Sequence, residues 1–226
     1  MDDLDEEQTC LIARANNPKV KKLTVSKVNW DKRAGQAIGD SETLRELQID
    51  IRLRPRKIDA WLGELLQHLP RNRSIKKFGI AVYPYAHRLN LNKYDLGTDT
   101  FRSLVAFIEH NSNLIDIELQ GGSTSMLRSL SSALSSCKNK RLERIKLTRY
   151  HQAEAGFREI FTSLVEYNNL REICVSFSKI DTEGVTVLSN LLNKPTSSIC
   201  SFELEGNVLD DEHITILGNG LIGNKN

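Results

Sequence analysis

A short hydrophobic pattern that recurs along most of the chain is the feature that most restricts its fold. Each copy reads apolar, two residues of any kind, then apolar–any–apolar, as in LERIKL at Leu142 and LREICV at Leu170. The last four copies begin at intervals of 28, 28 and 29 residues. A fixed period of this length is typical of a repeat protein whose units pack against their neighbours. The first residues of the copies are Val20, Leu44, Ile75, Leu114, Leu142, Leu170 and Ile199.

Every copy of the pattern predicts a short β-strand, because its last two apolar residues alternate and therefore share one face. Between the copies the apolar spacing changes to that of an amphipathic helix, for example at Phe157, Ile160, Phe161 and Leu164. Alternating strands and helices of this size require parallel strands joined by right-handed crossovers. No single unit can bury both of its apolar faces, so we expect the units to stack.

An asparagine three residues before the pattern predicts where the preceding helix stops. The four such residues are Asn17, Asn72, Asn111 and Asn139. Asparagine tolerates the left-handed backbone conformation that ends many helices, so we expect that conformation at these positions.

This strand–helix unit with the pattern L-x-x-L-x-L resembles the ribonuclease-inhibitor-like leucine-rich repeats. The best match is residues 199–209, ICSFELEGNVL, in which Asn207 occupies the asparagine position of the family motif. In that family this asparagine satisfies backbone groups where the strand turns into the next loop. The other copies have Val28, Tyr150 or Ser178 nearby instead. The resemblance implies an α/β fold, namely a right-handed β/α leucine-rich-repeat solenoid, a horseshoe arc with about seven parallel strands on the concave face and helices on the convex face.

We expect a single solenoid domain over residues 1–226. An N-terminal helix within 1–19 should cover the first repeat. About ten extra residues between the third and fourth copies place an inserted loop at 83–97, and such insertions often belong to a binding face; a tolerated surface insertion is the alternative. Asn224 stands where a helix stop belongs, so we expect a chain truncated before an eighth strand, a fragment, or a protein that pairs through this end.

The sequence contains no motif typical of an enzyme, a metal site or a cofactor site. None of the four cysteines belongs to a C-x-x-C pair, so zinc is not expected and all four are predicted to be free thiols. The stretch GNGLIG at 218–223 matches a dinucleotide-binding pattern, but it follows a predicted helix, so it is interpreted as a helix end. Gly121 and Gly122 should lie in a strand-to-helix loop that has a Ser/Thr cap. We therefore expect no catalytic residue, no cofactor, no metal and no small-molecule substrate.

The chain shows no targeting signal. Its first ten residues are acidic, unlike a secretory signal, and no apolar run reaches the roughly 18–20 residues that span a bilayer. We expect a cytoplasmic protein with no membrane partner, and the nucleus stays open as an alternative.

Two rows of strand residues should face the concave side and offer a surface to a partner. Seven strands at about 4.8 Å spacing make a face about 34 Å wide, which suits a protein interface of roughly 800 Å² per partner. Cys174 falls in the first row and should point to the same side. The row members that we predict to contact a partner are Gln48, Asp50, Glu118, Gln120, Lys146, Thr148, Glu203 and Glu205.

The charge is unevenly distributed, although its net value is only +2. Residues 19–93 carry 17 Lys/Arg against 7 Asp/Glu, a net +10. Positions just before three successive strands are basic, which predicts a basic edge that attracts an acidic protein or nucleic-acid phosphates; a solvated edge is the alternative. Tyr83 and Tyr85 would add base stacking for single-stranded RNA. The basic residues are Lys21, Lys22, Arg45, Lys76 and Lys77.

These features favour a non-catalytic scaffold that binds another protein through the concave face and adjoining loops. Members of this repeat class include nuclease inhibitors, Ran GTPase-activating proteins, tropomodulins and immune sensors, which work through protein surfaces, so the resemblance implies the same here. Two alternatives stay open. One is a nucleic-acid or acidic-partner adaptor that uses the basic edge. The other is a GTPase-activating protein of the leucine-rich-repeat type, although no arginine matches a catalytic motif of that family.

Overall fold

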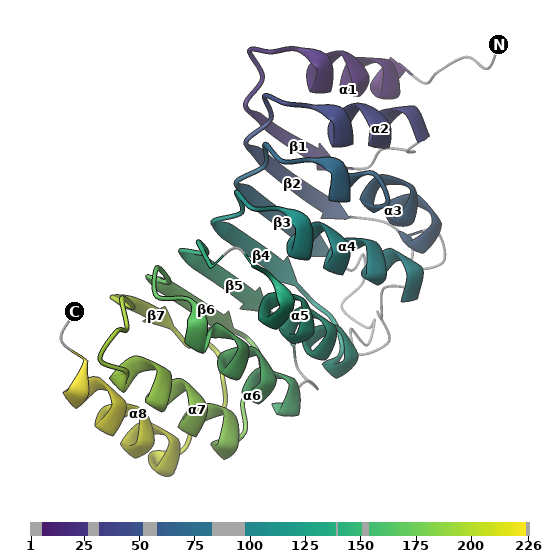
Figure 1. The fold of residues 1–226 in the computed structure, drawn as a ribbon. Coiled ribbons are helices and arrows are strands. Elements are labelled where there is room, and N and C mark those ends of the chain that lie inside the picture. The colour runs from purple at the N-terminus through teal and green to yellow at the C-terminus, as the bar shows by residue number, and fades with distance from the viewer. Residues whose placement is uncertain are drawn as a thin grey trace. The chain divides into compact units, whose positions relative to one another are not determined.

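In a computed structural model of the chain, strands and helices alternate along the sequence (Figure 1), which confirms the predicted α/β class. The described residues are 6–26, 32–51, 58–82, 98–138, 140–150 and 154–224. The chain divides into two compact units: unit 1 is Met1–Leu89 with Leu96–Leu114, and unit 2 is Asn90–Asp95 with Ile115–Asn226. The predicted inserted loop at 83–97 lies outside the described residues.

Unit 1 contains parallel strands with helices on one side of them (Figure 1). Its described strands are β1 Lys22–Ser26, β2 Glu46–Ile51 and β3 Lys77–Val82. Its described helices are α1 Glu6–Asn16, α2 Lys32–Asp40, α3 Ile58–Leu66, the short 3₁₀ helix η2 Leu69–Arg71, and α4 Thr98–His110. Helix α1 lies within the segment 1–19 that was predicted to be helical.

Unit 2 repeats the same alternation with more even spacing. Its described strands are β4 Asp116–Gln120, β5 Arg144–Thr148, β6 Glu172–Ser176 and β7 Ser201–Glu203. Its described helices are α5 Thr124–Ser136, α6 Glu154–Ser163, the 3₁₀ helix η4 Leu164–Glu166, α7 Thr182–Asn193 and α8 Asp211–Gly223.

The strands within each unit pair in parallel and in chain order, and their register aligns the repeated pattern. In unit 1, Leu47 of β2 lies between Leu23 and Phe78 of the neighbouring strands. In unit 2, Ile145 of β5 lies opposite Ile173 of β6. These side chains are buried, so each unit has a continuous row of apolar residues beneath its strands. All seven copies of the pattern form parallel strands, as predicted.

Helix α2 was not predicted, because its buried side is made mostly of small residues. Gly39 shows why small residues are needed: a Cβ at this position would lie 2.5 Å from the carbonyl oxygen of His68. Ala34 and Ala37 are buried on the same helix. A close approach between α2 and the turn that follows α3 therefore replaces the bulky apolar stripe that marks the other helices.

The described asparagines Asn17, Asn72 and Asn111 each follow the end of a helix, as predicted, but the left-handed conformation expected there is wrong. Asn72 has φ −72° and ψ 128°, which is extended backbone. Among the described residues, every non-glycine residue with positive φ lies in unit 2, so Asn17 and Asn111 are not left-handed either. Asn139 lies outside the described residues.

The buried Asn72 side chain instead joins two successive repeats of unit 1. Its Oδ1 accepts hydrogen bonds from the backbone N–H groups of Ser74 and Ile75, at 2.8 and 3.0 Å. Its Nδ2 donates to the carbonyl oxygens of Ile38 and Ser41, both at 2.9 Å. The side chain thus satisfies backbone groups of the preceding helix end and of the turn into β3, which the backbone alone leaves unpaired.

Asn207 performs a similar task at the other end of the strands in unit 2. Its Nδ2 donates to the carbonyl oxygens of Val175 and Leu204, and its Oδ1 accepts from the backbone N–H of Ser178 at 3.2 Å. One repeat earlier, Oγ of Ser178 accepts from the backbone N–H of Tyr150 at 3.0 Å. Ser178 therefore replaces asparagine at the equivalent position.

Replacing Asn72 with alanine should lower the free energy of unfolding by about 2–4 kcal/mol, because buried backbone groups would lose their partners. Asn17→Ala is the matched control. Asn17 occupies the same repeat position but is exposed and accepts from the backbone N–H of Lys19. The control should cost less than about 1 kcal/mol. Urea unfolding followed by circular dichroism measures both, and equal losses would contradict the proposed role.

Candidate functional site

On unit 2 the predicted contact rows carry charges that pair across neighbouring strands. Lys146 Nζ lies 3.2 Å from Glu118 Oε1. Arg144 Nη2 lies 2.9 Å from Asp116 Oδ2, and this hydrogen bond raises the pKa of Arg144. Arg144 also approaches Glu172 at 3.8 Å. A partner that binds here must therefore compete with existing ion pairs, and Glu118 and Lys146 do not act as independent charges.

Two residues expected on this face are not accessible. Thr148 is buried; it lies in register with Gln120 of the neighbouring strand. Cys174 lies in the predicted row but is only 2% exposed. Its Sγ is 3.3 Å from Oγ of Ser176, which donates in turn to Glu203. Burial raises the pKa of the Cys174 thiol, so it stays protonated near neutral pH.

A left-handed turn recurs directly after the strands of unit 2. Its residues are Gly121, Arg149, Phe177 and Gly206, with φ of 78°, 64°, 51° and 66°. The backbone N–H of each of the first three donates to a carbonyl of the next repeat, at 2.8, 3.0 and 2.7 Å. Glycine adopts this conformation freely, whereas a bulky side chain is strained in it. Arg149 and Phe177 therefore occupy positions that would favour glycine.

The two strained residues are also exposed. Phe177 is 44% exposed and rests against Gly206, where a Cβ would lie 2.5 Å from the Phe177 ring. Val208, two residues further on, is 77% exposed. We call Arg149, Phe177 and Val208, with the exposed carboxylates of Glu203 and Glu205, the turn surface.

The predicted contact residues did not include Arg149, Phe177 or Val208. An alignment of the repeats could have pointed to this turn, because it places Gly121, Arg149, Phe177 and Gly206 at one repeat position. Two glycines at an aligned position indicate a turn with positive φ, and the other two repeats depart from it. Glu203 and Glu205, which were predicted, are exposed beside this turn.

In unit 1 the predicted basic edge is partly neutralised. Glu46 lies in register between Lys22 and Lys77, and its carboxylate is 3.4 and 3.6 Å from their Nζ atoms. Lys21 donates to the carbonyl oxygen of Pro18. These exposed pairs contribute little stability, but they lower the positive charge that the edge presents.

Two other predicted residues of the unit 1 face, Gln48 and Asp50, hydrogen bond to each other at 3.1 Å and are half-buried. Tyr83 and Tyr85, predicted to stack on bases, lie outside the described residues.

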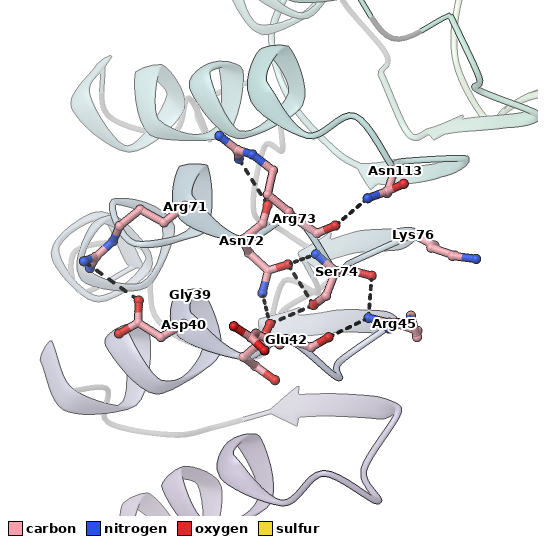
Figure 2. A pocket seen from close by; sticks show the side chains of 11 residues that line it. Gly39, Asp40, Glu42, Arg45, Arg71, Asn72, Arg73, Ser74, Lys76 and Asn113 are labelled. Carbon is pink, nitrogen blue, oxygen red and sulfur yellow. Dashed lines mark hydrogen bonds and ion pairs between the residues drawn. The ribbon is translucent and has the colours of Figure 1, made fainter.

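The two other basic residues of this edge, Arg45 and Lys76, line a pocket of about 590 Å³ where three helix-to-strand turns of unit 1 meet (Figure 2). The hydrogen-bonded side chains of Asn72 and Ser74 lie at its centre. Asn113, from the turn after α4, donates to the carbonyl oxygen of Arg73 at 2.7 Å. The lining residues are Gly39, Asp40, Ser41, Glu42, Arg45, Arg71, Asn72, Arg73, Ser74, Lys76 and Asn113.

The cysteines and the glycine-rich motifs that were considered as possible chemical sites lie in ordinary structural positions. Cys137, Cys174 and Cys200 are free, as predicted; the side chain of Cys10 lies outside the described part. The GNGLIG stretch falls in the last turns of α8, and Ser123 caps α5 by accepting from the backbone N–H of Met126. Both structural interpretations are confirmed.

Within the described ranges, no three His, Cys, Asp or Glu side chains are grouped so that they could hold a metal ion. The helices in the same ranges include none with the length and apolar character needed to cross a bilayer.

No protein-family model matches this sequence, and no curated protein matches it. What the turn surface and the pocket can bind therefore follows from their own geometry and charge.

Arg149→Gly should raise the free energy of unfolding by about 0.5–1 kcal/mol, because relief of left-handed strain exceeds the added flexibility of glycine in the unfolded chain. Gly206→Ala should lower it by about 2 kcal/mol or more, since alanine meets both an unfavourable φ and the Phe177 ring. Urea unfolding of both variants tests the assignment. A loss of stability in Arg149→Gly would show that the arginine contributes contacts that outweigh its strain.

His68 should make the stability of the protein sensitive to mild acid. It is 7% exposed, and its Nδ1 lies 2.6 Å from Arg71 Nη2. Burial, and then the positive charge of Arg71, lower the pKa of His68 below its ordinary 6.5; Glu64 and Asp40 oppose this shift, and Lys32 adds to it. As the pH falls below 6.5, His68 therefore becomes protonated in the unfolded chain before it does so in the folded chain. The contribution of His68 to the free energy of unfolding is thus fully present above pH 6.5 and is lost as the pH falls below that value.

The measurement is thermal unfolding at pH 7.5 and pH 5.5 for the wild type and for His68→Gln. The variant should lose less stability between the two values than the wild type does. An identical loss in both would assign the acid sensitivity to other groups.

Proposed function

We propose that the chain is a leucine-rich-repeat protein of the ribonuclease-inhibitor type, a β/α solenoid that binds another protein and performs no catalysis. Support comes from the constant register within each group of strands and from the side chain of Asn207, which bonds backbone groups of two repeats. Three free thiols fit a reducing compartment such as the cytoplasm, which is part of the proposal.

The observation that carries the proposal of protein binding is the turn surface of unit 2. Arg149 and Phe177 hold a conformation that costs each of them on the order of 1 kcal/mol or more, and both side chains are nevertheless exposed, Phe177 at 44%. Strained residues persist where the side chain performs a task that glycine cannot. Aromatic and arginine side chains are the types that most often dominate the energy of protein interfaces.

The chemistry of the turn surface suggests how a partner would fit. Phe177 and Val208 offer an apolar centre, and Arg149 on one side makes no ion pair with any described residue. Glu203, at the end of β7, and Glu205, in the turn that follows, add two exposed carboxylates. An apolar anchor surrounded by charges of both signs matches the common arrangement of a buried centre and a polar rim.

Phe177→Ala should weaken partner binding by about 2 kcal/mol, which is roughly a thirtyfold loss of affinity, because a central anchor is truncated. The assay is affinity capture from a native extract of the source cells, quantified by mass spectrometry. Val165→Ala is the matched control, since Val165 is an exposed apolar residue of unit 2 that lies on η4 and outside the turn surface.

Arg149→Gly separates binding from stability in the same assay. The proposal expects this variant to fold at least as stably as the wild type and to capture less of the partner. If the wild type, Phe177→Ala and Arg149→Gly all recovered the same proteins in the same amounts, the turn surface would not be the binding site.

A further inference from the structure

The pocket of unit 1 carries more positive charge than its own carboxylates neutralise. Four of its lining residues are basic, and only Asp40 and Glu42 are acidic. Arg71 pairs with Asp40 at 3.8 Å. Arg45, Arg73 and Lys76 make no ion pair with a carboxylate anywhere in the described residues. The pocket therefore has a local excess of cations, while the edge beside it is partly neutralised by Glu46.

The two unpaired arginines are held in place by one nitrogen each. Nη1 of Arg45 donates to the carbonyl oxygens of Glu42 and Ser74, at 2.9 and 3.2 Å. Nη1 of Arg73 donates to the carbonyl oxygens of Pro70 and Asn72. In both guanidinium groups the Nε and Nη2 atoms are left without a partner among the described residues. This pair of N–H groups is the edge that binds a carboxylate in a bidentate manner.

The turns that carry these arginines are fixed by side-chain hydrogen bonds. Oγ of Ser74 lies 2.7 Å from each of the carbonyl oxygens of Ser41 and Leu44, which share its single hydroxyl proton. Asn113 holds the carbonyl of Arg73 from the next turn. Little order has to be gained when a ligand binds, because the backbone that presents the cations is already tied across three turns.

The geometry points to binding of an acidic peptide segment of a partner protein in this pocket, with two of its carboxylates held by Arg45 and Arg73. Figure 2 shows the Arg73 side chain on the opposite side of Asn72 and Ser74 from Arg45, and Lys76 on a third side. Cations that are spread around a hollow fit carboxylates spaced along a chain better than one compact phosphate. In an extended peptide the side chains of alternate residues are about 7 Å apart on one face.

An acidic peptide also fits better than a single-stranded nucleic acid. None of the eleven residues that line the pocket is aromatic, and single-stranded nucleic acids are held largely by stacking of their bases on aromatic rings. The proposal deepens the proposed function, because it rests on protein binding and names the chemistry of one partner segment.

The test uses the full chain and fluorescently labelled N-acetyl hexaglutamate, followed by fluorescence anisotropy at about 0.15 M salt, where long-range attraction is screened beyond about 8 Å. Hexaglutamine, hexalysine and an oligouridylate of equal charge are the comparison probes. The wild type should bind hexaglutamate, and it should bind the three other probes at least about tenfold more weakly, since the site supplies charge-assisted hydrogen bonds and no stacking.

The double variant Arg45→Gln/Arg73→Gln should bind hexaglutamate about tenfold or more weakly than the wild type. The matched control is Arg171→Gln with Lys138→Gln, which removes the same charge from exposed positions in helix-to-strand turns of unit 2. Arg171 stands directly before β6, as Arg45 stands before β2. The control should lose less than about twofold, because neither residue lines the pocket.

The double variant Arg45→Lys/Arg73→Lys keeps the charge and tests the bidentate geometry. It should bind several times more weakly than the wild type. The proposal would be overturned if Arg45→Gln/Arg73→Gln and the control Arg171→Gln/Lys138→Gln lost the same affinity for hexaglutamate. It would also be overturned if the wild type bound oligouridylate more tightly than hexaglutamate. These outcomes leave the turn surface unaffected, because Phe177→Ala should bind hexaglutamate like the wild type.

Discussion

The structure depends on a single constraint: neighbouring strands within a unit keep one register, so each repeat position has its counterpart one strand away. Apolar positions then meet apolar positions, as Leu47 meets Phe78. Charged positions meet partners of opposite sign, as Glu46 meets Lys22 and Lys77. The polar side chains of Asn72 and Asn207 bond the backbone of adjacent repeats, so a shift of one residue would leave their partners unpaired.

The hydrophobic pattern was sufficient to predict all seven strands and most helices, because burial of apolar side chains decides both their position and their type. It failed at α2, where a close approach of the backbone at Gly39 selects small residues that leave no apolar stripe. It also gave the wrong conformation for Asn72. The backbone of Asn72 is extended, and in that conformation its side chain makes four hydrogen bonds to backbone groups. The residue type alone suggested a left-handed residue at the end of a helix.

The candidate site was less predictable than the fold, since accessibility depends on the neighbours of a side chain. Thr148 and Cys174 occupy the expected rows and are nevertheless buried. Arg45 and Lys76 were expected at an edge, but the pocket they line depends on how three turns meet, which the spacing of residues does not encode. The strain at Phe177 became visible only with its φ angle, although the glycines at the aligned position indicated it.

The recurring turn of unit 2 has a consequence for how such a chain can change over generations. The carbonyl oxygens of Thr148, Ser176 and Glu205 each accept a hydrogen bond from the N–H of the turn residue in the repeat before. The junction between repeats is therefore interchangeable, and duplication of one whole 28-residue unit would insert a new turn residue without disturbing its neighbours. Each such event adds one more side chain at the Arg149 and Phe177 position, so the capacity to recognise a new partner can grow by whole repeats rather than by remodelling the old ones.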